Sequence, residues 1–236
     1  MKNFASVSPL KILEQSTAQK SLGAGNIGVL IAKAGVGKTA CLIHMALHKL
    51  FEGEPMVHVA VGDTPEKINA YYRVIFSDLA KAIEEYDIDD CLLKIDRGKV
   101  VLSYMDDNFD PARLNRNLRN LKESLSFSPK FIIIDGIDFT SAQRELFIEI
   151  KKLAEEFNSE IWLTALINRH MTAEVNNNGI PYPCSHSHVD DIFNIIIHMH
   201  PEKNGLFLSL LKDHSGYISK DIKVRLDPTT FLLAQE

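Results

Sequence analysis

The sequence is poor in cysteine. Its three cysteines, Cys41, Cys91 and Cys184, are widely spaced and odd in number. Disulfide-stapled folds and Cys-x-x-Cys metal modules need paired cysteines at short, regular spacings. The pattern therefore argues against both kinds of framework, and we expect the thiols to be reduced.

Long apolar runs are missing as well. No stretch of about 18 consecutive apolar residues exists that could cross a bilayer. The opening segment MKNFASVSPLKILEQ has no apolar core followed by a small-residue cleavage site, so secretion is not indicated. These absences predict a soluble, cytoplasmic protein without a membrane partner.

An excess of positive charge is also absent, because the formal net charge is -5. The surface as a whole does not attract nucleic acid, so such binding would need a local basic patch. Internal repeats and low-complexity segments are lacking over the 236 residues. We expect a single domain spanning 1–236, with 1–20 as a lead-in segment.

Strand-like and helical patterns alternate along most of the chain. Runs typical of buried strands occur at 27–32, 56–61, 99–104, 130–135 and 160–165. Helical patterns occur at 9–20, 39–51, 65–86, 111–126 and 141–157. This alternation predicts an α/β fold with a mainly parallel sheet covered by helices on both faces.

The C-terminal part follows another pattern. Four strand-like runs are joined by turns rather than by helices, at 193–199, 205–212, 217–225 and 229–233. Short turns between consecutive strands are typical of antiparallel pairing. We therefore expect an antiparallel extension of the sheet.

The segment AKAGVGKT, residues 32–39, lies between a buried strand and a helix and is called the glycine loop below. It matches the phosphate-binding loop pattern, with Ala32 in place of the first glycine. Its glycines allow consecutive N–H groups to point at one anion, and the helix that follows adds positive potential. Lys38 would reach the β- and γ-phosphates, and the Thr39 hydroxyl would bind Mg²⁺. The predicted nucleotide-binding residues are Ala34, Gly35, Val36, Gly37, Lys38, Thr39 and Ala40.

A second anchor for magnesium is predicted at Asp135. The segment KFIIID, 130–135, is an apolar run that ends in this carboxylate, and a parallel sheet would place it at the same edge as the glycine loop. Thr39 and Asp135 are therefore the predicted metal ligands. Asp138 follows in the same segment, and we interpret it as a turn former.

The order of these motifs resembles the RecA-like ATPases, most closely the motor domain of DnaB-type replicative helicases and the KaiC-like proteins. The resemblance covers roughly residues 20–234. It implies a P-loop NTPase fold, an ATPase activity with ATP and Mg²⁺, and assembly of several copies head to tail. In VHVAVGDTPEKI, Asp63 stands where those families carry a water-polarising Glu. In LLKDHSGY, Lys212 matches an element that reaches the γ-phosphate bound to a neighbouring subunit, and His214 replaces its Arg.

The departures from the family pattern predict slow hydrolysis. Asp63 is one methylene shorter than Glu, although a general base must come within about 3 Å of its water. Leu166 stands where the helicases have a Gln sensor, whereas Asn168 and Arg169 match. A neutral His214 stabilises transferred phosphate less than a guanidinium does. The resemblance thus implies an ATPase with a weakened catalytic constellation, in which Lys38, Asp63, Lys212 and His214 are the candidate catalytic residues.

Two functions remain open from the sequence. The first is an ATPase of helicase-like ancestry associated with single-stranded DNA. The second is a KaiC-like regulatory or assembly protein in which nucleotide stabilises a homo-oligomer and turnover is incidental.

Several other patterns have a structural reading that we favour. The helix at 111–126 carries a basic face, which is typical of a solvated surface and less often of a nucleic-acid contact. This face consists of Arg113, Arg116, Arg119 and Lys122, opposite Leu114, Leu118, Leu121 and Leu125. The loop at 168–190 corresponds in position to loops that grip single strands, but its basic and aromatic content is low.

Metal binding outside the glycine loop is a weaker alternative. Ligand-capable side chains gather in the same loop without the paired spacing of zinc modules: His170, Cys184, His186 and His188. His44 and His48 stand four apart on the helix after the glycine loop, without the Glu of a zinc-protease motif. We expect these two histidines to form an exposed helix face.

Overall fold

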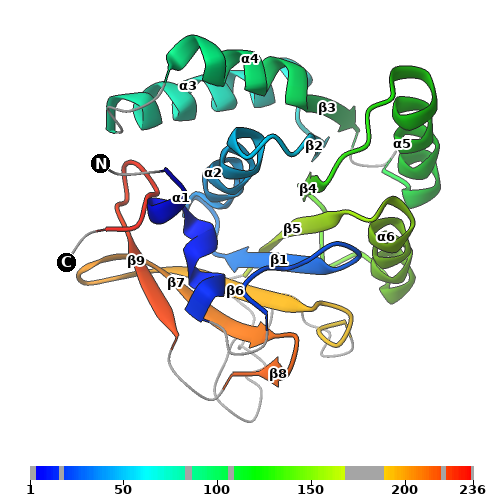
Figure 1. Ribbon diagram of the computed structural model, residues 1–236. Helices are drawn as coiled ribbons and strands as arrows, with labels where there is room; N and C mark the ends of the chain where they lie inside the picture. Colours follow the sequence, from blue (N-terminus) through cyan, green and yellow to red (C-terminus); the bar gives the residue numbers. More distant parts are fainter. Residues whose placement is uncertain are drawn as a thin grey trace.

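The computed structural model describes residues 4–15, 19–82, 87–105, 109–167, 189–218 and 222–234. It is an α/β fold with a mostly parallel central sheet flanked by helices and extended by antiparallel C-terminal strands (Figure 1). The first five strands are β1 (Ile27–Ala32), β2 (Met56–Val61), β3 (Lys99–Tyr104), β4 (Phe131–Asp135) and β5 (Glu160–Leu166). The C-terminal strands are β6 (Ile195–Glu202), β7 (Gly205–Asp213), β8 (Gly216–Tyr217) and β9 (Lys223–Leu226).

The strands form one sheet in the order β3-β2-β4-β5-β1-β6-β7-β8, and β9 pairs with β7. The pairs from β3 to β6 are parallel, and the pairs that β7 makes with β6, β8 and β9 are antiparallel. Strand β6 therefore connects the parallel and the antiparallel parts of the sheet, since it runs parallel to β1 and antiparallel to β7. The first three strands have the bounds expected from the apolar runs.

Helices cover both faces of the parallel sheet (Figure 1). They are α1 (Phe4–Val7), the 3₁₀ helix η1 (Pro9–Gln15), α2 (Lys38–Phe51), α3 (Pro65–Ala82), α4 (Ile88–Gly98), α5 (Pro111–Leu125) and α6 (Arg144–Phe157). Strand β1 alternates between two cores. Leu30 packs in the core with α2, α3 and α4, whereas Val29 and Ile31 pack in the core with α5 and α6. Burial of both faces explains why this strand is apolar throughout.

Several expected elements differ in the structure. The helix expected at 65–86 is α3 over Pro65–Ala82, and 83–86 lie outside the described ranges. The additional helix α4 follows, with the Asp87 side chain accepting bonds from the N–H groups of Asp89 and Asp90. Helix α4 buries only Cys91 and Ile95 among its described residues, and the sequence analysis did not single it out. The helix expected at 9–20 is a 3₁₀ helix that ends at Gln15, and the one expected at 141–157 starts at Arg144.

The tail also departs from the expectation. The run at 217–225 is not one strand, because β8 ends at Tyr217 and β9 begins at Lys223. The strand expected at 229–233 is wrong: Asp227 accepts bonds from the N–H groups of Thr229 and Thr230, which makes a turn, and a single bridge joins Leu226 to Leu233. Side-chain competition for the backbone favours this turn over a ladder.

No helix in the described ranges is long and apolar enough to span a bilayer.

Candidate functional site

The glycine loop joins the end of β1 to the start of α2. Gly35 has φ 76° and Gly37 has φ 105°, a left-handed conformation that glycine adopts at little cost. Gly37 is the N-cap of α2, and no side chain caps the helix there. The N–H groups in the first turn of α2 therefore have no side-chain cap. N–H groups of this kind at a helix N-terminus favour the binding of an anion.

Gly37 is also in close contact with the tail. A Cβ at this position would lie 2.3 Å from Cζ of Phe231, so the aromatic ring rests directly on the loop backbone. Phe231 itself has φ 53°, an uncommon conformation for an aromatic residue. The contact of Phe231 with the loop was not expected, because 229–233 reads as a strand in the sequence.

Asp135 and Thr39 meet at the same edge of the sheet, as predicted. The Thr39 hydroxyl lies 2.6 Å from one carboxylate oxygen of Asp135. The hydroxyl of Thr164, on β5, donates to the other carboxylate oxygen. Strand β5 lies between β1 and β4, so it places Thr164 beside Asp135. Sequence reasoning missed Thr164 because nothing in IWLTALINRH distinguishes it from an ordinary strand residue.

This pair fits a hard divalent cation. A threonine hydroxyl and a carboxylate supply oxygen ligands, and the remaining positions around Mg²⁺ are ordinarily filled by water and phosphate oxygens. The hydrogen bond from Thr164 fixes the orientation of the Asp135 carboxylate. Hydrogen bonds of this kind commonly orient the side chains that bind a metal. The described residues contain no group of three or more His, Cys, Asp or Glu side chains that could hold a metal by themselves.

Lys38 lies at the mouth of the site. Its Nζ is 3.4 Å from the carbonyl oxygen of Lys33, within the same loop. Burial lowers the pKa of the Lys38 ammonium, and the nearby Asp135 carboxylate partly opposes this shift. A partly desolvated lysine beside open N–H groups is stabilised by a bound anion.

A cavity of about 400 Å³ opens beside the loop. Its polar end is formed by Gly35, Gly37, Lys38, Thr39, Ala40 and Asp63, and its apolar wall by Tyr71, Val74 and Ile75 of α3. Tyr71 is 41% exposed and Val74 59% exposed. The sequence did not single out this wall, since outward residues of a helix carry no periodic signal.

Asp63 lines this cavity, but its carboxylate is already engaged. It forms an ion pair of 2.5 Å with Lys67, which lies in the first turn of α3. Both side chains are more than a third exposed, so the pair is readily exchanged for water. Asp63 is brought to the site, yet it is held toward Lys67.

Lys212 and His214 lie elsewhere. Strand β6 runs parallel to β1 and β7 returns antiparallel, so β7 ends at the sheet edge opposite the glycine loop (Figure 1). There Lys212 donates to the carbonyl oxygen of Asp190 at 2.6 Å, and Nε2 of His214 is 3.2 Å from the carbonyl oxygen of Ser21. The structure does not bring these two side chains to the loop of their own chain.

Other predicted residues are only partly described. Leu166 ends β5 and is 49% exposed. Asp138 accepts bonds from Thr140 and Ser141, which confirms it as a turn former. The loop residues outside the described ranges are Asn168, Arg169, His170, Cys184, His186 and His188.

The expectation of an exposed face at His44 and His48 is wrong. His44 is 3% exposed and lies between the rings of Phe4 and Phe231, with centroids at 6.3 Å and 6.2 Å. Burial lowers the pKa of His44 to about 4. The first helix and the tail both fold over α2, a tertiary contact that helical periodicity cannot reveal.

Helix α5 has the expected N-cap, because the Asp110 side chain accepts a bond from the N–H of Ala112. Its basic face is partly paired, since Arg119 bonds Glu156 of α6 at 2.6 Å and Arg113 lies over the Tyr104 ring. Leu125, expected on the apolar face, is 69% exposed because it is the last residue of the helix.

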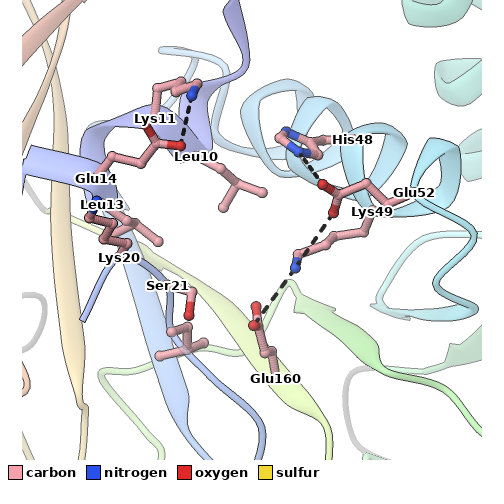
Figure 2. Close-up of a pocket in the computed structure, with 11 residues that line it drawn as sticks. Leu10, Lys11, Leu13, Glu14, Lys20, Ser21, His48, Lys49, Glu52 and Glu160 are labelled. Carbon is pink, nitrogen blue, oxygen red and sulfur yellow. Dashed lines mark hydrogen bonds and ion pairs between the residues drawn. The ribbon is translucent and has the colours of Figure 1, made fainter. Parts of the chain in front are cut away.

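A second, smaller cavity of about 160 Å³ lies between η1 and the end of α2 (Figure 2). Figure 2 shows the ion pairs along its wall: Lys11 with Glu14, His48 with Glu52, and Lys49 with Glu52 and Glu160. Burial raises the pKa of Glu160, and the Lys49 ammonium opposes the shift. The Lys49 pairs connect α2 with Glu160 of β5, whereas the Lys11–Glu14 pair lies within η1.

No protein-family model matches the chain, and no curated protein matches it.

Proposed function

We propose that the chain is a RecA-like P-loop NTPase domain that binds ATP with Mg²⁺ at the glycine loop. One observation carries the proposal: the Thr39 hydroxyl, in the first turn of α2, and the Asp135 carboxylate, at the end of β4, lie 2.6 Å apart. A threonine after a glycine-lysine pair, hydrogen-bonded to a strand-ending carboxylate, is the arrangement that binds Mg²⁺ in such NTPases.

The remaining residues divide the cavity into two ends. The N–H groups of the loop and the Lys38 ammonium would hold the phosphates, with Thr39 and Asp135 holding the metal. When bound, Mg²⁺ would neutralise phosphate charge. The apolar wall of Tyr71, Val74 and Ile75 would hold the nucleoside part, and Val74 and Ile75 offer no side-chain hydrogen bonds to select a base.

Hydrolysis by this site is expected to be slow. Asp63, the candidate base, is paired with Lys67 at 2.5 Å and must break that contact to reach a water. Leu166 has no group that could hydrogen-bond a phosphate. The weak constellation supports an ATP-binding protein whose turnover is limited by chemistry.

The position of Lys212 and His214 favours a second candidate, nucleotide-gated assembly without motor activity. These side chains lie at the edge opposite the loop, so they could contact a nucleotide only if it were bound by another copy. To do so, Lys212 would first have to break its hydrogen bond to the carbonyl oxygen of Asp190. Burial lowers the pKa of Lys212, and a phosphate would offset that cost.

Calorimetric titration with ATP and Mg²⁺ tests the proposal. Lys38→Ala removes a charged contact worth about 1.5–3 kcal/mol, so the dissociation constant should rise about 10- to 100-fold. Lys33→Ala is the matched control, because only its backbone carbonyl contacts Lys38. Asp135→Asn should abolish the dependence on Mg²⁺. An absence of binding by the folded wild type, or equal losses in the two lysine variants, would contradict the proposal.

Single-turnover hydrolysis tests the role of Asp63. Asp63→Glu adds the missing methylene and should raise the rate, whereas Asp63→Asn should lower it. Lys67→Ala frees the Asp63 carboxylate and should act in the same direction as Asp63→Glu. Unchanged rates in all three variants would remove Asp63 from the chemistry.

A further inference from the structure

The C-terminal strands leave one sheet face without a helix over it in the described structure. Alternation along β7 and β9 sends Leu206, Leu208, Val224 and Leu226 into the core. The residues between them point the other way. We call this the β6–β7–β9 face, and it consists of His198, His200, Phe207, Ser209, Lys223 and Arg225.

Three aromatic rings form a row on this face. The rings of His198 and His200 are stacked with centroids 4.6 Å apart, and the ring of Phe207 follows at 6.3 Å from His200. All three residues are partly exposed. Nε2 of His200 is held by the Ser209 hydroxyl at 2.9 Å, so the row is fixed to the sheet.

Several cationic side chains lie near this row of rings. The Lys223 ammonium lies 5.1 Å from the centroid of the Phe207 ring, and the Arg225 side chain lies along Gly205, whose added Cβ would be 3.0 Å from Nε. Lys33 is near His198, because β1 and β6 pair Ile31 with His198 and the Lys33 charge contributes to lowering the His198 pKa. Lys203 lies in the turn between β6 and β7.

Two carboxylates belong to the same region. Glu202 pairs with Lys223 at 3.3 Å, both more than a third exposed, so a stronger anion can displace it. Asp227 accepts bonds from its own turn at Thr229 and Thr230, and the nearby Arg225 contributes to lowering its pKa. Against these two carboxylates stand four cations: Lys33, Lys203, Lys223 and Arg225. The balance on the face is therefore positive, although the chain carries a net charge of -5.

We propose that the β6–β7–β9 face binds single-stranded nucleic acid, with Lys223, Arg225 and Lys33 contacting phosphates and the edge of the ring row contacting bases. Partly exposed rings flanked by cations on a sheet can bind unpaired strands, since phosphates supply charge and unpaired bases supply apolar surface. A duplex hides its base faces and would use only the cations. The inference does not rest on ATP binding.

Fluorescence anisotropy of a labelled oligothymidylate, measured without nucleotide over a salt series, tests this inference. The double substitution Lys223→Ala/Arg225→Ala should weaken binding about tenfold and reduce the slope of log K against log salt by about 1.4, since each lost phosphate contact on a single strand contributes about 0.7. Phe207→Leu keeps the side chain apolar but removes the ring, so it should weaken binding about fivefold or more. Glu202→Gln should strengthen binding.

The matched control is Arg116→Ala/Lys122→Ala, which removes the same charge from the exposed face of α5. It should leave the affinity and the salt slope near wild type. Equal losses in the two double variants, unchanged binding in the face variants, or equal affinity for a duplex of the same length would overturn the assignment.

A readout of ATP binding on the same variants separates this inference from the proposed function. The face variants should bind ATP as wild type does, because none of the substituted residues lines the cavity beside the glycine loop. Loss of oligonucleotide binding with ATP binding retained supports the face. Normal oligonucleotide binding in Lys38→Ala would show that the two sites act independently.

Discussion

At the residue scale, Gly37 meets two demands that no other residue type satisfies. Its φ of 105° is unfavourable for any side chain, and the Phe231 ring occupies the place of a Cβ. Gly35 also has a positive φ, but nothing lies within 4 Å of its added Cβ. A comparison of substitutions at Gly37 and Gly35 therefore separates the cost of backbone strain from the cost of a steric clash.

We therefore predict that Gly37→Ala destabilises the fold by about 2–4 kcal/mol, the sum of strain and overpacking. Gly35→Ala should cost about 1 kcal/mol from strain alone. Urea unfolding of both variants measures the difference. Phe231→Ala in the Gly37→Ala background should recover part of the loss, and a double variant no better than the single one would argue against the contact.

His44 predicts a pH dependence of stability. Its pKa is lowered from 6.5 to about 4 by burial, so the unfolded state binds the proton more readily. The stability it contributes is complete above pH 6.5 and is lost as pH falls toward 4, about 3 kcal/mol in all.

Replacing this histidine should flatten the pH dependence. His44→Leu should reduce the loss of unfolding free energy between pH 6.5 and 4.5, measured by urea titration at each pH. His214→Gln is the control, because that side chain lies in an exposed contact. An unchanged slope in His44→Leu would contradict the buried, neutral state.

At the scale of elements, α5 shows how far local signals reach. Asp110 and Pro111 start the helix where the sequence places it, and the capping bond is 3.0 Å. Helix α4 has a cap as well, at Asp87, yet only two of its residues are buried, Cys91 and Ile95. Caps mark where a helix can begin, whereas burial decides whether it forms.

Asp110→Ala should therefore lower the free energy of unfolding by about 1 kcal/mol, the usual value of an N-cap. Glu123→Ala, on the exposed side of the same helix, should change it by less than about 0.5 kcal/mol. Thermal and urea unfolding measure both. A loss in Glu123→Ala as large as that in Asp110→Ala would mean that the cap is not the source.

At the scale of the whole molecule, a ligand that binds only the folded state stabilises it. ATP with Mg²⁺ at about 100 times its dissociation constant should add about 2.7 kcal/mol and raise the melting temperature. Asp135→Asn should lose the part of this increase that needs Mg²⁺. No increase with wild type, under conditions where the chain is folded, would contradict nucleotide binding.

Assembly is the second prediction at this scale. If Lys212 contacts a nucleotide held by another copy, the mass measured by light scattering should increase with ATP and Mg²⁺ and not without them. Lys212→Ala should reduce the increase while ATP still binds each copy. A constant mass would remove the assembly candidate without affecting the glycine loop.

The sequence by itself determined the features that depend on neighbours along the chain. The glycine loop, the strand that ends in Asp135, the alternation that makes the sheet parallel and the N-cap at Asp110 all follow from spacing and local conformational preference. The edge shared by Thr39 and Asp135 was predictable too, because parallel strands end on the same side.

Only the tertiary structure decided which distant side chains meet. Thr164 behind Asp135, Phe231 on Gly37, the wall formed by Tyr71 and the burial of His44 each join segments far apart in the chain. The row of His198, His200 and Phe207 likewise exists because β6 and β7 pair in one register. Such contacts depend on register and packing, which are properties of the folded chain rather than of any short segment.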